Sequence, residues 1–362
     1  MRRRNNFLPP LILFLLSVLF VAGAQTGAGS PPPQTPQAGT PAARSGSESA
    51  PPQNFGSGTP SASQTKTQDT GQMPESGDSG VFVFRKQVEE VILHATVIDD
   101  KQRIVTNLDR TAFKVYEDEH LQTITSFHRE DIPVSMGIVV DNSGSMREKR
   151  QKVNAAALNL VRSSNPSDEV FVVNFNDEYY LDQDFTSSIN KLKEALEKIE
   201  ARGGTALFDA VVASADHLKK NGRLDKKVLF VVTDGDDNSS AESLEQTVRR
   251  LQAENGPTVY AIGILGDEER PKRARRALQV MSERTGGIAF FPKTLDEVDE
   301  ISRTVAHDIR NQYTIGYKPS TPKNQGGYRT VRVEAKSHGY SKLVVRTRSG
   351  YYAGPEPASG AQ

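Results

Sequence analysis

Cysteine is absent from this 362-residue chain. Without it the protein has neither disulfides nor thiolate metal ligands, so an exported domain must be held together by its core alone. An excess of charge of one sign is lacking too, because 45 Lys and Arg residues balance 45 Asp and Glu residues. A balanced chain has no global field that attracts nucleic acid or an anionic membrane, so we expect neither as a partner.

The signatures of several enzyme classes are also missing. The six histidines are scattered, without the H-E-x-x-H spacing of a zinc helix. Neither a G-x-S-x-G nucleophile elbow nor a G-x-x-x-x-G-K-[ST] phosphate loop occurs. One dense basic run, residues 270–276, follows acidic residues and is typical of the solvated face of a helix, with a polyanion-binding patch as the alternative. These absences favour a protein that is not an enzyme.

The N-terminus has the three parts of a secretory signal peptide. Residues 2–4 are basic, residues 7–21 are apolar, and Ala22-Gly23-Ala24 forms an A-x-A cleavage site. We predict a signal peptide over residues 1–24; an uncleaved membrane anchor is the alternative, but the apolar run is short and two prolines interrupt it. No later stretch is apolar enough to span a bilayer. The prediction is an exported protein, periplasmic, cell-surface or secreted, without a membrane span after cleavage.

Composition divides the rest of the chain into five segments. Residues 25–80 are rich in Pro, Gly, Ser, Thr and Gln and are predicted to be a disordered linker. Residues 81–133 and 312–353 contain short alternating apolar runs, such as "VILHATV" and "YRTVRVEA", which predict β-strands. Because neither flank makes a stable sheet alone, we expect both to pair into one β-sandwich-like domain. Residues 354–362 are predicted to be a disordered tail, and residues 134–311 form the middle.

The middle segment alternates continuous apolar strands with helical periods. The strands read "SMGIVV", "EVFVVNF", "KVLFVVT", "TVYAIGI" and "IAFF", and the helical periods lie at residues 153–162, 188–200, 207–220, 241–253, 271–284 and 295–309. Such uniformly apolar strands are typical of a parallel sheet with helical crossovers on both faces. The stretch "EYYLDQDFT" follows the second strand after a short turn and is predicted to be an antiparallel edge strand. We therefore expect a doubly wound, mostly parallel α/β domain.

Oxygen-bearing side chains occupy three loops at the edge where such sheets bind ligands. The stretch "DNSGSM" supplies Asp141, Ser143 and Ser145, "GGTALFDA" supplies Thr205, and "VLFVVTDGDDN" supplies Asp234. Two carboxylates and three hydroxyls suit Mg²⁺, which prefers oxygen ligands in octahedral geometry. A D-x-S-x-S pattern alone also fits a helix N-cap, but the three loops together favour a metal site.

The predicted ligand set leaves room for a further ligand. If the neutral hydroxyls coordinate directly and the carboxylates balance charge, directly or through water, the ion keeps an open position that a carboxylate from another molecule would fill. Two further acidic residues, Asp236 and Asp237 in "DGDDNSS", lie beside the site. They are candidates for a secondary cation site, with a solvated acidic loop as the alternative.

Taken together, "DNSGS", "GGTA" and "TDG" resemble the von Willebrand factor type A domain and its metal-ion-dependent adhesion site, over about half of the chain. The resemblance implies a six-stranded sheet and a divalent ion, usually Mg²⁺ with Mn²⁺ or Ca²⁺ as alternatives. It also implies that an Asp or Glu of a protein partner completes the coordination. Signal peptide and β-rich flanks together resemble exported bacterial proteins that carry this domain.

We therefore expect an exported adhesion or assembly module that captures a partner's carboxylate through its metal ion. Two alternatives stay open. A metal-assisted hydrolase would need a positioned base near the ion, which the sequence does not display. A scaffold would use the metal only to stabilise its loops.

Overall fold

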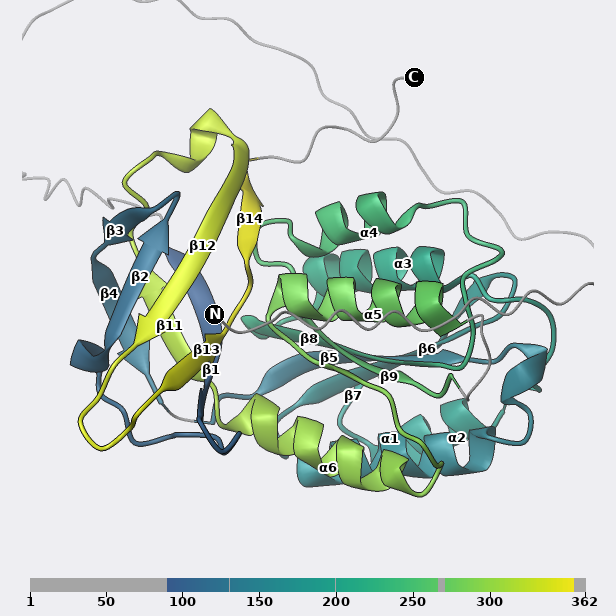
Figure 1. Ribbon diagram of the computed structural model, residues 1–362. Helices are drawn as coiled ribbons and strands as arrows, with labels where there is room; N and C mark the ends of the chain where they lie inside the picture. Colours follow the sequence, from purple (N-terminus) through teal and green to yellow (C-terminus); the bar gives the residue numbers. More distant parts are fainter. Residues whose placement is uncertain (1–89, 130, 199, 266–270, 355–362) are drawn as a thin grey trace, which may run out of the picture. The chain divides into compact units, whose positions relative to one another are not determined.

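This computed structural model describes residues 90–129, 131–198, 200–265 and 271–354 (Figure 1). The described part of the chain contains three β-sheets. All of these residues belong to one compact unit, Val81–Gln362. The predicted signal peptide, the linker and the tail from residue 355 lie outside the described residues.

The strands, in chain order, are β1 Val91–Asp99, β2 Phe113–Glu117, β3 His120–Gln122, β4 Ile124–His128, β5 Val134–Asp141, β6 Glu169–Phe175, β7 Tyr179–Thr186, β8 Lys226–Thr233, β9 Thr258–Gly263, β10 Ala289–Phe290, β11 Tyr313–Tyr317, β12 Gly327–Ala335, β13 Leu343–Arg346 and β14 Gly350–Ala353. The helices are α1 Arg150–Ser163, α2 Ile189–Glu197, α3 Leu207–Asn221, α4 Leu244–Leu251, α5 Pro271–Thr285 and α6 Glu297–Arg310.

The middle of the chain forms the six-stranded sheet, in the order β10-β9-β8-β5-β6-β7. Neighbouring strands from β10 to β6 are parallel, and β7 pairs with β6 in the antiparallel sense. Every residue of β5, β6 and β9 is buried, as continuous apolar runs require. The predicted doubly wound sheet and its antiparallel edge strand are confirmed.

Helices cover both faces of this sheet. Figure 1 shows α3, α4 and α5 on one face and α1, α2 and α6 on the other. Successive residues of β5 point to opposite faces. Ile138 therefore packs in a core with Leu160 of α1, and Val139 packs in a second core with Leu278 of α5. Two apolar cores thus hold β5 and β8 side by side, so that their carboxyl ends reach the same edge.

The chain before and after the α/β domain forms one β-sandwich. Its two antiparallel sheets have the orders β13-β1-β11-β4 and β14-β12-β2-β3. Strands from the two flanks alternate within them, because β11 pairs with β1 and β4 while β12 pairs with β2. Side chains from both flanks, among them Leu93, Val115, Ile315 and Val333, share one core. The predicted flanking domain built from both sides of the α/β domain is confirmed.

A buried charged cluster joins the two flanks inside this sandwich. The carboxylate of Glu117 on β2 accepts hydrogen bonds from the hydroxyls of Tyr317 at 2.6 Å and Tyr351 at 2.9 Å. The guanidinium of Arg329 on β12 lies 3.2 Å from the same carboxylate, and both charged side chains are about 3% exposed or less. Burial raises the pKa of both tyrosines above the ordinary range. The cluster therefore links strands of both flanks through an ion pair and hydrogen bonds that are shielded from water.

Candidate metal centre

The five predicted ligands lie at the carboxyl edge of the six-stranded sheet. Asp141 is the last residue of β5, Asp234 directly follows the neighbouring strand β8, and Thr205 lies just before α3. The backbone N–H of Gly144 donates to the carbonyl of Gly203 at 3.2 Å, which joins the first loop to the second. The fold therefore brings the three loops to one place.

Asp141 is fully buried at the base of the site. Its Oδ1 accepts the backbone N–H of Ser143 at 2.7 Å, and its Oδ2 accepts the hydroxyl of Thr233 at 2.6 Å. Burial raises the pKa of Asp141 to about 6, although these hydrogen bonds act in the opposite direction. With both oxygens held by protein donors, this carboxylate fixes the shape of the first loop.

Oxygen atoms of Ser143, Ser145 and Asp234 form a chain at the site. The Oγ atoms of Ser143 and Ser145 are 3.1 Å apart, and the Ser145 hydroxyl donates to Oδ1 of Asp234 at 2.8 Å. Adjacent oxygen ligands of an octahedral Mg²⁺, each at ~2.0–2.1 Å from the ion, stand about 2.9 Å apart. The donor set and its spacing therefore fit a hard divalent cation.

Lys149 adds a positive charge that the motif did not indicate. Its Nζ forms an ion pair with Oδ2 of Asp234, whose side chain is fully buried. The same carboxylate thus accepts the Ser145 hydroxyl with one oxygen and meets an ammonium with the other. Lys149 therefore offsets part of the negative charge of the site.

Thr205 lies beside these groups. Its side chain is buried, and its loop is held by reciprocal bonds with Asn238, whose Oδ1 accepts the Thr205 N–H at 2.9 Å. A Cβ placed on Gly235 would lie 3.3 Å from the Thr205 hydroxyl, which locates that hydroxyl against the residue after Asp234. No hydrogen bond within the described residues joins it to the other four side chains. Hydrogen bonds thus link four predicted ligands, and Thr205 adjoins them.

The turn before Thr205 requires glycine. Gly203 has φ of +76°, and a Cβ there would lie 2.0 Å from a carboxylate oxygen of Asp177. That carboxylate accepts the N–H of Gly204 at 2.8 Å. Asp177 therefore positions the loop that carries Thr205.

The two acidic residues after Gly235 have different surroundings. Oδ2 of Asp237 accepts the N–H of Phe208 at 2.9 Å and the Ser240 hydroxyl at 2.6 Å, so it caps the first turn of α3. Burial raises the pKa of Asp236, while Arg273 opposes that rise. No three His, Asp or Glu side chains among the described residues are placed to hold a metal ion together. A secondary cation site at Asp236 and Asp237 stays a prediction.

Sequence reasoning missed three residues that shape this centre: Thr233, Lys149 and Asp177. A threonine that ends an apolar strand next to an aspartate is a usable signal, and Thr233 could have been found by it. Lys149 and Asp177 reach the site only through the fold, since they meet residues 85 and 27 positions away.

Comparison with known proteins supports the assignment of the middle domain. Residues 136–236 match the family model described as the von Willebrand factor type A domain. This range contains all five predicted ligands. Among curated proteins, the chain is similar to an uncharacterized protein of Synechocystis sp., with 21% identity over 190 residues. The similarity covers 50% of this chain and spans only 45% of that relative.

Two solved structures are also similar. The first is described as von Willebrand factor type A from Catenulispora acidiphila, with 15% identity, a TM-score of 0.43, and coverage of 75% of this chain and 74% of that one. The second is the vWF domain of the type V pili tip protein Mfa5 from Porphyromonas gingivalis, with 13% identity, a TM-score of 0.41, and coverage of 49% and 97%.

Proposed function

Because the chain carries a von Willebrand factor type A domain, we propose that it is an exported protein-binding module that captures a partner's carboxylate through a divalent cation. The observation that carries this proposal is the chain of oxygens from Ser143 through Ser145 to Asp234 at an open edge of the sheet. Ser145 is exposed there, so a partner can approach.

The predicted ligands would hold the ion in two ways, directly and through the loop that carries two of them. The hydroxyls of Ser143, Ser145 and Thr205 and the carboxylate of Asp234, whose Oδ1 accepts the Ser145 hydroxyl in the absence of an ion, would hold Mg²⁺, with Mn²⁺ or Ca²⁺ as alternatives. Asp141 would act through the loop that it orders, since both of its oxygens already accept hydrogen bonds from protein. The bound ion supplies a Lewis acid that attracts an anionic oxygen.

The charge of the site favours an acidic ligand. Asp141 and Asp234 bring two negative charges and Lys149 brings one positive charge. A bound divalent cation would therefore leave one positive charge at the centre. A single carboxylate of a partner, from Asp or Glu, neutralises it.

The surface beside the site extends this preference. A groove of about 830 Å³ runs along α1 and α2, with Arg147, Arg150, Arg162 and Lys193 in its lining against two glutamates. Within the described residues, Nε of Arg150 is buried without a hydrogen-bond partner. A partner segment with further acidic residues would meet complementary charge there.

The proposed module is exported and is not an enzyme. Its signal-peptide features support export to the periplasm, the cell surface or the medium. No helix in the described part of the chain is long and apolar enough to cross a membrane. A hydrolase at this centre is the alternative; it would need a general base beside the ion, whereas Lys149, the basic side chain that contacts a predicted ligand, is engaged in an ion pair.

Partner capture is expected to require the ion and Thr205. Pull-down from envelope extract should recover a partner with Mg²⁺ and lose it with EDTA. Thr205→Ala should weaken capture even where metal is retained, because Thr205 comes from a separate loop. Replacing the partner's critical carboxylate with its amide should cost about 2–5 kcal/mol of binding.

Thr304→Ala is the matched control, since Thr304 is an exposed α6 residue whose hydroxyl bonds only within its helix. It should bind as the unaltered chain does. Capture of every partner in EDTA would leave only the scaffold. Metal-dependent turnover of ester, phosphate or peptide substrates, lost in Asp141→Ala, would establish the hydrolase instead.

A further inference from the structure

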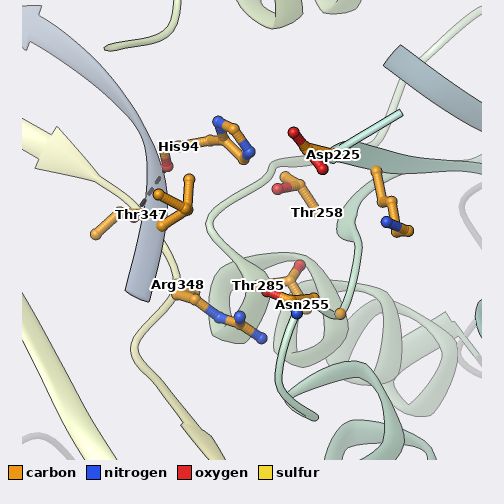
Figure 2. A pocket seen from close by; sticks show the side chains of 10 residues that line it. His94, Asp225, Asn255, Thr258, Thr285, Thr347 and Arg348 are labelled. Carbon is orange, nitrogen blue, oxygen red and sulfur yellow. Dashed lines mark hydrogen bonds between the residues drawn. The ribbon is translucent and has the colours of Figure 1, made fainter. Parts of the chain in front are cut away.

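A small cavity lies where the β-sandwich meets the α/β domain, at the amino ends of β8 and β9. Its volume is about 150 Å³. The sandwich contributes His94 from β1 and Arg348 from the segment between β13 and β14, and the α/β domain contributes Lys227 and Thr258. Figure 2 shows the imidazole and the guanidinium facing the cavity from different sides. The metal centre lies at the other end of β8, so the two sites are separate.

Basic groups predominate in the lining of this cavity. Nη2 of Arg348 donates to the carbonyl of Ala253 at 2.9 Å, and Nζ of Lys227 donates to the carbonyl of Leu224 at 3.2 Å. Within the described part of the chain, neither cation forms an ion pair with a carboxylate. The acidic lining residue, Asp225, is exposed, so water screens its charge. Both cations are thus hydrogen-bonded to neutral carbonyls, and Glu254, a carboxylate whose charge acts on Arg348, is engaged in an ion pair with Lys323.

This weakly compensated charge is partly withdrawn from water, since Lys227 and Arg348 are both half-buried. Burial lowers the pKa of Arg348 to about 10, and burial with repulsion from Lys226, Arg348 and Lys227 lowers the pKa of His94 to about 3. Buried cations are normally paired, because desolvation without a partner is unfavourable. An anion in the cavity would supply the missing partner.

We propose that this cavity binds a small oxyanion of the phosphate or carboxylate class, held by the guanidinium of Arg348, the ammonium of Lys227 and the hydroxyl of Thr258. A guanidinium fork matches two oxygens of such a ligand. A water needs ~10–15 Å³ of volume measured in this way, so the cavity has room for a tetrahedral oxyanion. Because the lining comes from both domains, the bound anion would stabilise their junction.

Acidification provides an independent probe of this cavity. His94 faces Lys226 and Lys227 of β8, Arg348, and the exposed Asp225. Its pKa is lowered in the folded chain, so the unfolded chain binds the additional proton, and stability is lost as pH falls from about 6.5 toward 3. His94→Gln should lose less stability between pH 7.5 and pH 5 in urea unfolding. The control His307→Gln, at an exposed position on α6, should lose as much stability between these pH values as the unaltered chain does. The same loss of stability in His94→Gln would contradict the placement of a neutral His94 among the basic groups of the cavity.

The oxyanion site can be tested on the mature chain in EDTA, so that the metal centre does not contribute. We expect inorganic phosphate or acetate to raise the melting temperature above that in chloride at equal ionic strength, and the two arms separate the two ligand classes. Lys227→Gln and Arg348→Gln should each weaken binding by about tenfold or more in calorimetric titration, as loss of a charged hydrogen bond does. Arg332→Gln, on the exposed face of β12, should leave binding unchanged. If Arg348→Gln does not fold, Lys227→Gln decides. Shifts no larger than those in chloride, or binding unaltered in Lys227→Gln, would overturn the proposal.

Discussion

Replacing Asp141 with alanine is expected to abolish the stabilisation that Mg²⁺ gives to the folded chain. An ion that binds only the native state at about 100 times its dissociation constant adds roughly 2.7 kcal/mol to the free energy of unfolding. Asp141 holds both the Ser143 N–H and the Thr233 hydroxyl, so its loss removes a negative charge and also releases the loop that carries two ligands. Urea unfolding across a Mg²⁺ titration measures the increment.

Asp296→Ala is the control for this experiment. Asp296 is an exposed residue just before α6 that pairs with Lys152 on the surface, and such pairs contribute little. This variant should keep the full Mg²⁺ increment. The same metal-dependent stabilisation in Asp141→Ala would refute the assigned site.

Glu117→Ala is expected to destabilise the β-sandwich by about 3–5 kcal/mol, as removal of one partner of a buried ion pair does. The substitution leaves Arg329 charged and nearly 97% buried, and it deprives the hydroxyls of Tyr317 and Tyr351 of their acceptor. Because these residues lie on strands from both flanks, protection of backbone amides from exchange should fall together in β1 to β4 and in β11 to β14. Urea unfolding and hydrogen exchange measure the two effects.

Glu119→Ala provides a matched comparison two residues away. Glu119 is exposed and pairs with Arg332 on the surface, so its loss should cost less than about 1 kcal/mol. Glu117→Gln keeps an acceptor for the tyrosines and should fall between the two alanine variants. Equal stability of the two alanine variants, or loss of protection in one flank alone, would show that the flanks are not one cooperative domain.

Elements whose signal is local could be predicted from the sequence. The run "EVFVVNF" marks β6 with its observed ends, since a strand buried on both faces is mostly apolar and does not alternate between apolar and polar residues. The sequence predicts a helix over residues 241–253, which starts three residues before the observed α4, Leu244–Leu251. Ser243 and Gln246 form a capping box that begins the helix at Leu244, and the carboxylate of Asp209 on α3 holds the two preceding N–H groups. That tertiary contact leaves no local pattern.

In the candidate site too, residues with a local signal could be predicted from the sequence, and residues placed by tertiary contacts could not. Asp141, Ser143 and Ser145 stand in one short motif, and a buried strand before them indicates where they lie in the fold. Lys149 could not be assigned to the site, because a lysine in a charged segment is indistinguishable from a solvated one until Asp234 is placed next to it. The cluster around Glu117 could not be predicted from the sequence either, because Tyr317 and Tyr351 follow Glu117 by 200 and 234 residues and meet it only in the fold.

A crystal of the mature chain grown with Mn²⁺ and examined by anomalous diffraction tests the central claim most directly. We expect an anomalous peak in contact with the hydroxyls of Ser143 and Ser145, with Thr205 beside it. One coordination position should face solvent, where a partner's carboxylate can bind. A peak enclosed entirely by protein ligands, or no peak at this edge of the sheet, would contradict it.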